Sequence, residues 1–231
     1  MIDKSRLEKL SAEYGITLTG GMLDKLDRYA EILVDYNEKV NLTAITDRRG
    51  IEEKHFLDSL LFAASPYVKG HIADIGSGAG FPGVVCLIYR PELELTVIDP
   101  LQKRAAFLRY LSGELGIKIN ILTERAEEAA PKGWREKFDT ATARAVANLP
   151  VLAEYCIPLV KVGGHFIAMK GEDDELSKGM NAINTLGAKY IETVEFTLPT
   201  AGSRKLIVCE KVKPTPAPYP RNGGKIKKKP L

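Results

Sequence analysis

Several residue types are scarce in this chain of 231 residues, which holds three cysteines, three histidines and one tryptophan. The three cysteines, Cys86, Cys156 and Cys209, lie far apart and form no C-x-x-C pair, which argues against a zinc site or a disulfide framework. No stretch approaches the roughly eighteen apolar residues of a membrane span, and the first residues lack an apolar core of signal-peptide length. We therefore expect a soluble, cytoplasmic protein without a metal.

Acidic residues are missing from the end of the chain. The whole sequence has 33 Lys+Arg against 30 Asp+Glu, a net charge of +3, but from Lys211 onward it has seven basic residues and no acid. Residues 1–210 consequently carry a net charge of −4. Alternating prolines, Gly223-Gly224 and a lysine run complete this end, and such a composition cannot bury a core. We predict that residues 212–231 form a disordered basic tail.

The first 65 residues have the periodicity of helices. One apolar stripe recurs at spacings of three and four residues: Met22, Leu26, Tyr29, Leu33, Tyr36 and Val40. Gly20-Gly21 separates this stripe from a short helix around Arg6–Tyr14, and a further helix is expected over Glu52–Ala64. These patterns predict a helical extension, residues 1–65, packed on the domain that follows.

Short apolar runs alternate with amphipathic stretches from residue 71. The predicted strands are His71–Ile75, Glu94–Ile98, Ile119–Leu122, Asp139–Ala143 and His165–Met169, then Tyr190–Thr197 and Lys205–Lys211. The predicted helices between them are Gly83–Arg90, Lys103–Leu115, Leu149–Val160 and Glu172–Leu186. Alternation of this kind indicates βαβ units and a parallel sheet, whereas the last two strands, with no helix between them, should pair antiparallel. We predict a Rossmann-like α/β domain over residues 66–211, with seven strands that are parallel except for the last.

A glycine-rich turn, Asp74-Ile75-Gly76-Ser77-Gly78-Ala79-Gly80-Phe81-Pro82-Gly83, joins the first predicted strand of this domain to its first helix. Glycines allow a tight turn and a close approach of the backbone to a ligand. Asp99 ends the second strand, where a carboxylate can accept the hydroxyls of a ribose. The strand, turn and helix context indicates a cofactor site.

Two cofactors compete for this turn. Gly78-x-Gly80-x-x-Gly83 also fits the dinucleotide fingerprint, so NAD remains an alternative to S-adenosylmethionine. Asp74 favours S-adenosylmethionine, because a carboxylate repels a pyrophosphate but can help to hold a methionine ammonium, directly or through water. The predicted antiparallel strand pair is also typical of Rossmann-like methyltransferases.

The chain resembles the bacterial small-subunit ribosomal RNA guanine-N7 methyltransferases, also called the glucose-inhibited division protein B family. The resemblance covers residues 15–211. Its segments are Tyr36-Asn37-x-x-x-Asn41-Leu42-Thr43, His55-x-Leu57-Asp58-Ser59, the turn Asp74–Gly83, Lys103-Arg104-x-x-Phe107-Leu108, Arg125-Ala126-Glu127-Glu128 and Ala143-Arg144-Ala145. The helical segments and Arg144-Ala145 make this match narrower than the cofactor turn alone.

The resemblance implies an S-adenosylmethionine-dependent class I methyltransferase that acts on 16S ribosomal RNA or on the small ribosomal subunit, as a monomer. It implies a cofactor pocket that includes Asp74, Gly76, Gly78, Phe81, Asp99, Ala126, Glu127 and Arg144. Gly76 and Phe81 would border the methionine, Asp99 the ribose, and Ala126 with Glu127 the adenine. Arg144 is the predicted catalytic residue, where cofactor and target base meet. His55 and Asp58 lie three apart on a helix, where a packing role is at least as plausible as catalysis, so neither is predicted to be catalytic.

Motifs that the sequence lacks restrict which atom of a base can be the methyl acceptor. Methylation of cytosine C5 needs a cysteine nucleophile, yet no cysteine occupies a loop at a strand end; amino-group methylation typically shows an Asp/Asn-Pro-Pro-aromatic segment where this chain has Arg144-Ala145-Val146-Ala147-Asn148. Guanine N7 has a free lone pair, so its methylation requires no base. We expect Arg144 to orient the guanine or a phosphate, and Lys170 and Arg204, near strand ends, to help hold RNA.

Two rival functions remain open at this point. One is an NAD-dependent oxidoreductase on a similar sheet, and the other is a non-catalytic RNA-binding or assembly protein with a vestigial pocket. The basic tail either adds RNA affinity without sequence preference or only increases solubility.

Overall fold

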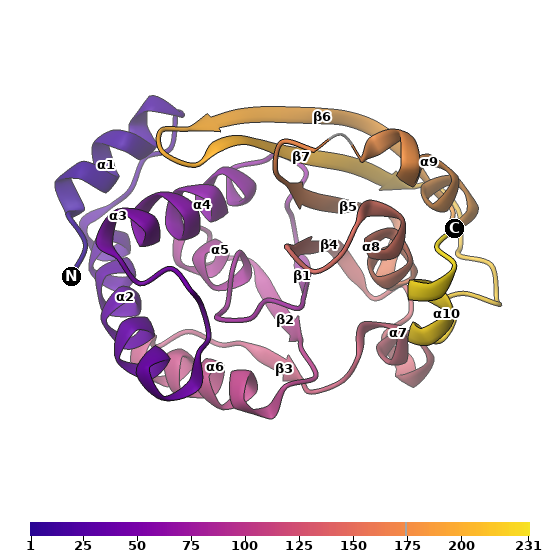
Figure 1. Cartoon of the computed structure of the whole chain (residues 1–231), viewed down its shortest axis with the longest axis horizontal. Coiled ribbons are helices and arrows are strands. Elements are labelled where there is room, and N and C mark those ends of the chain that lie inside the picture. The colour runs from indigo at the N-terminus through magenta and orange to yellow at the C-terminus, as the bar shows by residue number, and fades with distance from the viewer. Residues whose placement is uncertain (174) are drawn as a thin grey trace.

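Seven strands form one sheet at the centre of the molecule in the computed structural model, which describes residues 1–173 and 175–231 (Figure 1). Asp174, within the helix predicted over Glu172–Leu186, lies outside the described residues. The strands are β1 (His71–Ile75), β2 (Glu94–Ile98), β3 (Asn120–Leu122), β4 (Phe138–Arg144), β5 (Val160–Lys170), β6 (Ala188–Leu198) and β7 (Gly202–Lys211). Six of them coincide with predicted strands to within three residues, whereas β5 begins five residues before the predicted His165.

The strand order is β3-β2-β1-β4-β5-β7-β6. Neighbouring strands from β3 to β5 pair in parallel, whereas β7 runs antiparallel to both β5 and β6. The predicted antiparallel pairing of the last two strands is confirmed. Because the chain order reverses at β1 and β4, the carboxyl ends of these two strands meet at a switch point, where ligands bind in open α/β sheets.

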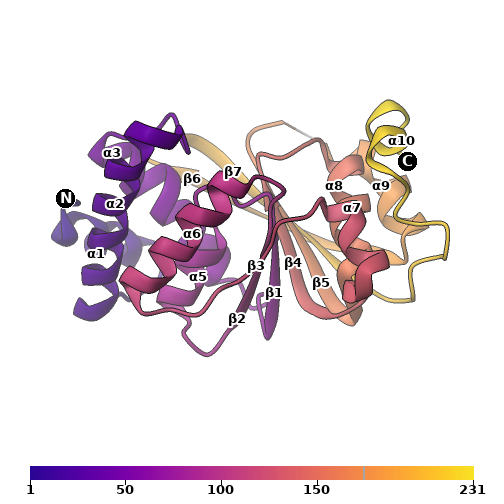
Figure 2. The same cartoon turned by 90° about the horizontal axis from the view of Figure 1, so that it is seen from below.

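Helices cover both faces of the sheet, as Figure 2 shows. One core contains apolar side chains from the N-terminal helices together with Ile72, Val97 and Val208 of the sheet. The other contains Ala73, Ala143 and Ile207, which alternate with the first set along the strands and point to the opposite face.

The helices are α1 (Lys4–Glu13), α2 (Gly20–Val40), α3 (Arg48–Gly50), α4 (Asp58–Ala63), α5 (Gly83–Tyr89), α6 (Gln102–Leu115), α7 (Ala126–Ala129), α8 (Leu149–Cys156), α9 (Leu176–Thr185) and α10 (Gly223–Lys228).

The apolar stripe predicted on α2 packs against the helices that cover one face of the sheet. Leu26, Tyr29 and Leu33 are fully buried in the same core as sheet residues. Thr19 caps the amino end by accepting a hydrogen bond from the Met22 amide, and Asn41 ends the helix in the left-handed conformation. The N-terminal helices therefore share a core with the sheet, and the domain boundary near residue 65 stays a prediction.

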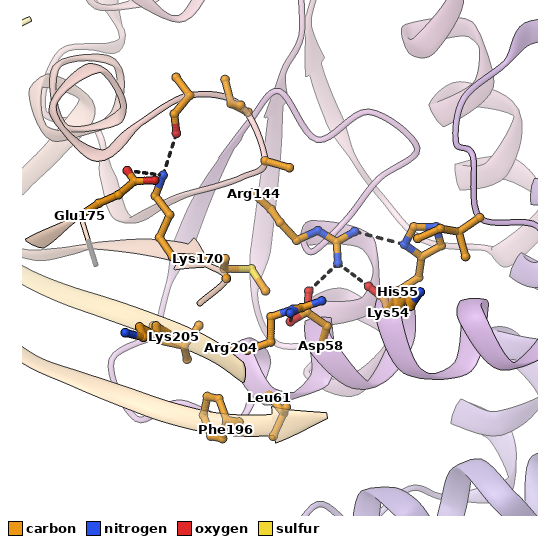
Figure 3. Close-up of a pocket in the computed structure, with 17 residues that line it drawn as sticks. Lys54, His55, Asp58, Leu61, Arg144, Lys170, Glu175, Phe196, Arg204 and Lys205 are labelled. Carbon is orange, nitrogen blue, oxygen red and sulfur yellow. Dashed lines mark hydrogen bonds and ion pairs between the residues drawn. The ribbon is translucent and has the colours of Figure 1, made fainter. Parts of the chain in front are cut away.

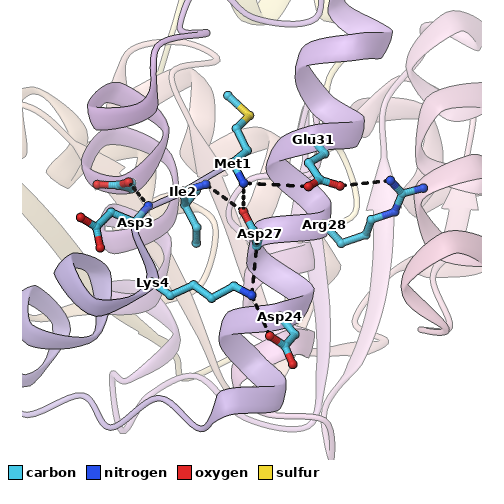
Figure 4. A network of polar contacts seen from close by, with 9 residues as sticks. Met1, Ile2, Asp3, Lys4, Asp24, Asp27, Arg28 and Glu31 are labelled. Atoms are coloured by element: carbon cyan, nitrogen blue, oxygen red, sulfur yellow. Dashed lines mark hydrogen bonds and ion pairs between the residues drawn. The ribbon is translucent and has the colours of Figure 1, made fainter.

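Polar contacts fasten α1 to α2 (Figure 4). The Met1 ammonium pairs with Asp27, whose carboxylate also accepts a hydrogen bond of 2.8 Å from the Ile2 amide. Lys4 lies 2.8 Å from Asp24 and 3.5 Å from Asp27. Several contacts on one carboxylate hold the start of the chain on α2.

The helix predicted over Glu52–Ala64 is present, but its first part has a wider winding. Residues Ile51–Leu57 form a π-helical turn, and the chain continues as α4 from Asp58. Such turns are rare, and they occur frequently at functional sites because they redirect side chains and backbone carbonyls. No helix in the described part of the chain is both long and apolar enough to span a membrane.

The prediction of a disordered tail over residues 212–231 is wrong. Ile226 on α10 is fully buried against the α8 and α9 layer. Arg221 forms several hydrogen bonds with Glu154, which is itself fully buried on α8. Composition misled here, because a segment too polar to build its own core can still be ordered by a few contacts with an existing face.

We predict that Arg221→Ala lowers the free energy of unfolding by about 3 kcal/mol, because it leaves the buried Glu154 carboxylate without its partner. Urea unfolding measures this change. Lys227→Ala, at an exposed position of α10, is the matched control and should change stability by less than about 0.5 kcal/mol. Equal stabilities for the two variants would show that Arg221 does not anchor the segment.

Candidate functional site

The predicted glycine turn lies at the carboxyl end of β1. Gly76 and Gly78 have φ angles of +67° and +60°, which side chains with a Cβ rarely adopt. A Cβ on Gly76 would stand 2.7 Å from Val146 in the loop after β4, so Gly76 is needed for close packing there. A Cβ on Gly78 would meet nothing within 4 Å. The backbone of Gly78 thus borders open space beside the sheet edge.

Asp74 lies under this turn with its carboxyl group fully buried. Its Oδ2 accepts a hydrogen bond of 2.8 Å from the Gly83 amide, which fastens the turn to the start of α5. Its Oδ1 has no hydrogen-bond partner among the described residues. Burial raises the pKa of Asp74 to about 8, although the Gly83 amide and Arg144 act in the opposite direction. An uncompensated buried oxygen of this kind is an acceptor available to a ligand cation or a water.

Asp99 is buried at the carboxyl end of β2, as predicted. Its Oδ1 accepts from the Leu101 amide at 3.0 Å, and its Oδ2 accepts from Arg104 at 2.9 Å and from the Gly78 amide at 3.4 Å. The carboxylate therefore links the glycine turn to α6. A ribose that bound here would share this carboxylate with Arg104.

Ala126 and Glu127 begin α7, which follows β3. Ala126 is buried, and the half-buried Glu127 lies against Gly223 of the C-terminal segment, where a Cβ would approach the Glu127 carboxylate within 2.0 Å. The predicted cofactor residues thus follow the carboxyl edge of the three neighbouring strands β1, β2 and β3.

Phe81 lies near the end of the glycine turn, and its side chain is only 4% exposed. The ring stacks between His55 and Tyr29, with centroid distances of 4.3 Å and 5.1 Å. The predicted contact with a methionine would therefore involve the backbone of Phe81 more than its ring. The Arg144 guanidinium lies over the same ring, 5.2 Å from its centroid.

A cavity of about 610 Å³ opens next to the glycine turn, at the end of β4 (Figure 3). Arg144 reaches into it and donates hydrogen bonds to Asp58 Oδ2 at 2.7 Å and to the Lys54 carbonyl at 2.9 Å. This carbonyl belongs to the π-helical turn Ile51–Leu57, so that turn contributes a contact to Arg144. The ion pair joins the N-terminal helical layer to β4.

His55 is a third contact of the Arg144 guanidinium. Its Nδ1 lies 3.4 Å from an Arg144 nitrogen, and its Nε2 lies 3.0 Å from Thr43 Oγ1. Burial, together with the Arg144 charge, lowers the pKa of His55 to about 3. The imidazole is therefore neutral at physiological pH, with Nδ1 as an acceptor for Arg144 and the proton on Nε2.

Lys170 and Arg204 line the same cavity, as Figure 3 shows. The Lys170 ammonium lies 2.8 Å from Glu175 and donates to the Ala147 carbonyl at 2.7 Å. Arg204 lies 3.6 Å from Asp58 Oδ1. The structure thus brings Arg144, Lys170 and Arg204 together around one cavity, while their roles toward RNA stay predictions.

Lys54, His55 and Asp58 also line this cavity, although none of them is among the predicted site residues. Asp58 is 5% exposed and contacts both Arg144 and Arg204. The His55-x-Leu57-Asp58-Ser59 segment was the available signal, since it belongs to the residues that carry the family resemblance. Among the described residues, no group of three or more histidines, cysteines and acids is arranged to hold a metal ion.

Comparison with known proteins now identifies the family. The sequence pattern of the family described as rRNA small subunit methyltransferase G matches residues 22–207. The chain belongs to this family. It is 45% identical to the ribosomal RNA small subunit methyltransferase G of Alkaliphilus metalliredigens over 238 residues, with all of both chains covered, and equally identical over 240 residues to that of Geobacillus thermodenitrificans, again with both chains fully covered. These alignments include the C-terminal segment.

Solved methyltransferases share the fold. A Burkholderia thailandensis 1,6-didemethyltoxoflavin-N1-methyltransferase with bound S-adenosylhomocysteine aligns with a TM-score of 0.56 at 13% identity, covering 81% of this chain and 90% of that one. A ribosomal protein L11 methylase from Lactobacillus delbrueckii aligns with a TM-score of 0.53 at 16% identity, covering 69% and 79%. The predicted class I methyltransferase fold is confirmed.

A double-mutant cycle tests the central ion pair of the site. We predict a coupling energy of about 2 kcal/mol between Asp58→Ala and Arg144→Ala in urea unfolding, because the pair is buried and hydrogen-bonded. The coupling of Asp58→Ala with Arg204→Ala should be smaller than about 1 kcal/mol, since that contact is 3.6 Å long. Equal couplings would contradict a special role for Arg144.

Proposed function

We propose that this protein transfers a methyl group from S-adenosylmethionine to N7 of a guanine in 16S ribosomal RNA, on naked RNA or in the small ribosomal subunit. The observation that carries the proposal is the adjacency of two features on one sheet edge. The glycine turn and Asp74 lie at the end of β1, and the Arg144 cavity lies at the end of the neighbouring β4. The relatives named above, ribosomal RNA methyltransferases, support the same assignment.

The residues along this edge fit S-adenosylmethionine. Asp74 Oδ1 is a buried acceptor without a partner, suited to a methionine ammonium directly or through water. Gly78 leaves room for a ligand at its open side, and Asp99 would hold the ribose. Ala126 and Glu127 would border the adenine. When bound, the cofactor supplies an electrophilic methyl group on its sulfonium sulfur.

The side chains around the cavity suit an acceptor that needs no deprotonation. His55 has a pKa of about 3 and is hydrogen-bonded through both ring nitrogens, and Asp58 is engaged by Arg144. Cys86, Cys156 and Cys209 are buried, and burial raises the pKa of each thiol, which leaves the described chain without a cysteine nucleophile for cytosine C5. Guanine N7 presents a lone pair, so alignment of the acceptor with the methyl group suffices; orientation can lower a barrier by about 7–11 kcal/mol.

Arg144 would orient the guanine. Its guanidinium is held by Asp58, the Lys54 carbonyl and His55, so it meets the acceptor with little freedom left to lose. Arginine stays charged and cannot act as a base. Its planar group can donate to guanine or to a phosphate, while Lys170 and Arg204 would hold neighbouring parts of the RNA.

The decisive experiment treats small-subunit rRNA with the purified protein and S-adenosylmethionine, followed by nuclease digestion and mass spectrometry. We expect one 7-methylguanosine per rRNA. Calorimetry with S-adenosylmethionine and NADH separates the oxidoreductase alternative. Binding of NADH alone, or cofactor binding without methyl transfer to rRNA or to the subunit, would contradict the proposal.

Substitution of Arg144 tests its role. We predict that Arg144→Ala and Arg144→Lys each reduce methylation by on the order of 100-fold, because an ammonium cannot reproduce the contacts of two guanidinium nitrogens. Circular dichroism confirms folding, and Arg109→Ala, on the exposed side of α6, is the control with unchanged activity. Full activity of Arg144→Lys would show that only the positive charge at this position matters, and that the geometry of the guanidinium does not.

Proton release tests the contact between Asp74 and the cofactor. At pH 6.5 the carboxyl of Asp74, with a pKa of about 8, is protonated in the free protein, whereas a methionine ammonium beside it favours the carboxylate. We therefore predict that binding of S-adenosylmethionine at about pH 6.5 releases about one proton, measured by calorimetry in buffers of different ionisation enthalpy. The release should fall as the pH rises through 8, and Asp74→Asn should abolish it. Release that persists in Asp74→Asn would assign the proton to another group.

A further inference from the structure

The C-terminal helix α10 presents a strongly basic surface. Lys225, Lys227, Lys228 and Lys229 are all exposed, and none forms an ion pair with the described residues. Several exposed lysines elsewhere are neutralised, such as Lys161 by Asp139 and Lys189 by Glu210. No acid follows Glu210 in the sequence, and these four lysines have no ion-pair partner among the described residues, although Glu127 of α7 lies beside Gly223 at the start of the helix.

The position of α10 is set by buried contacts. Ile226, between the lysines, is fully buried, and Arg221 binds the buried Glu154 of α8. The Asn222 side chain caps the helix, and Gly223 packs against Glu127 of α7. Helices α7 and α8 both begin at the carboxyl edge of the sheet, so these contacts hold α10 beside that edge, as Figure 2 shows. Ordering in the free protein lowers the entropy lost when the lysines bind a partner.

A second uncompensated basic group lies on the opposite helical layer. Arg48 and Arg49 of α3 are exposed and form no ion pair with residues that the structure describes. The loop before them contributes Ile45 to the lining of the Arg144 cavity. In Figure 2, α3 and α10 lie on the two sides of the sheet, toward the same edge. The cavity thus lies between two basic groups.

We propose that the phosphate backbone of the RNA crosses the carboxyl edge of the sheet, held by Arg48 and Arg49 on one side and by the α10 lysines on the other. This inference rests on the proposed function and extends it from the target base to the flanking nucleotides. Residues 1–210 carry a net charge of −4 and repel a polyanion on average, so binding depends on where positive charge is concentrated. Arginine and lysine side chains that carry no protein counter-charge favour phosphates, since each contact releases counterions from the nucleic acid.

The test compares three variants of the full chain for binding to small-subunit rRNA at several salt concentrations. The first changes Lys225, Lys227, Lys228 and Lys229 to alanine, and the second changes Arg48 and Arg49 to alanine. The control changes four exposed lysines away from this edge, Lys9, Lys25, Lys118 and Lys137, to alanine and so removes the same net charge as the first variant. Thermal unfolding and calorimetry with S-adenosylmethionine verify that all variants fold and bind the cofactor.

Each lost phosphate contact reduces the slope of log affinity against log salt by about 0.7 to 0.9. We expect the lysine variant to lower the slope by about 2 to 3 and to weaken binding at least roughly tenfold at about 50 mM salt, and the arginine variant to lower the slope by about 1 to 2. The control should lower the slope by less than about 0.5, because its lysines lie elsewhere. The KM for rRNA should rise in the first two variants with kcat nearly unchanged, since no residue of the cavity is altered.

Slopes equal to that of the control would overturn the proposal. Loss of affinity for the assembled subunit with unchanged affinity for naked rRNA would also overturn it and would indicate an acidic ribosomal protein as the partner. Failure of the proposed function has a different signature, because the unaltered protein would then not methylate rRNA at all. If the lysine or arginine variant methylates rRNA with unchanged KM and salt slope, the proposed phosphate contacts are wrong while the proposed function still stands.

Discussion

The ion pair between Arg144 and Asp58 connects the sheet to the N-terminal helical layer, and the cavity of the candidate site depends on both. Arg144 ends β4 on the sheet, whereas Asp58 begins α4 in the N-terminal helical layer. Both side chains are largely buried, so neither tolerates loss of the other. The contact ties the helix to the sheet at the wall of the cavity beside the glycine turn. Asp58 also approaches Arg204 on β7, and one carboxylate thereby holds two cations of the cavity wall.

Much of the fold could be predicted from local sequence patterns. Short apolar runs separated by amphipathic stretches predicted every strand of the sheet, and in the central strands β1, β2 and β4 such runs are buried on both faces. The π-helical turn over Ile51–Leu57 was not predictable, since its apolar spacing resembles that of an ordinary helix. The order of residues 212–231 was missed for a related reason. Arg221 and Ile226 are stabilised by partners on α8 and its neighbours, which composition cannot reveal.

The structure brings the predicted site residues to the carboxyl edge of the sheet, and it surrounds Arg144 with side chains that are not among them. Asp74, Gly78 and Asp99 could be placed because a turn between strand and helix has a fixed relation to the sheet edge. The ring of Phe81 could not, since its stack with Tyr29 and His55 joins residues distant in sequence. His55 and Asp58 were recognised as a pair on one helix, but only the fold shows that they face Arg144. The individual roles of the cofactor and RNA residues stay predictions.

The strand order has a consequence for biosynthesis. Strand β7 lies between β5 and β6 in the sheet but is made after both. A nascent chain that has reached only residue 201 therefore has an unpaired β5 edge and a β6 with no strand to join. Exposed strand edges of this kind promote aggregation. The same strand brings Arg204 to Asp58. The addition of β7 late in synthesis therefore joins β6 to the sheet and also completes the wall of the cavity.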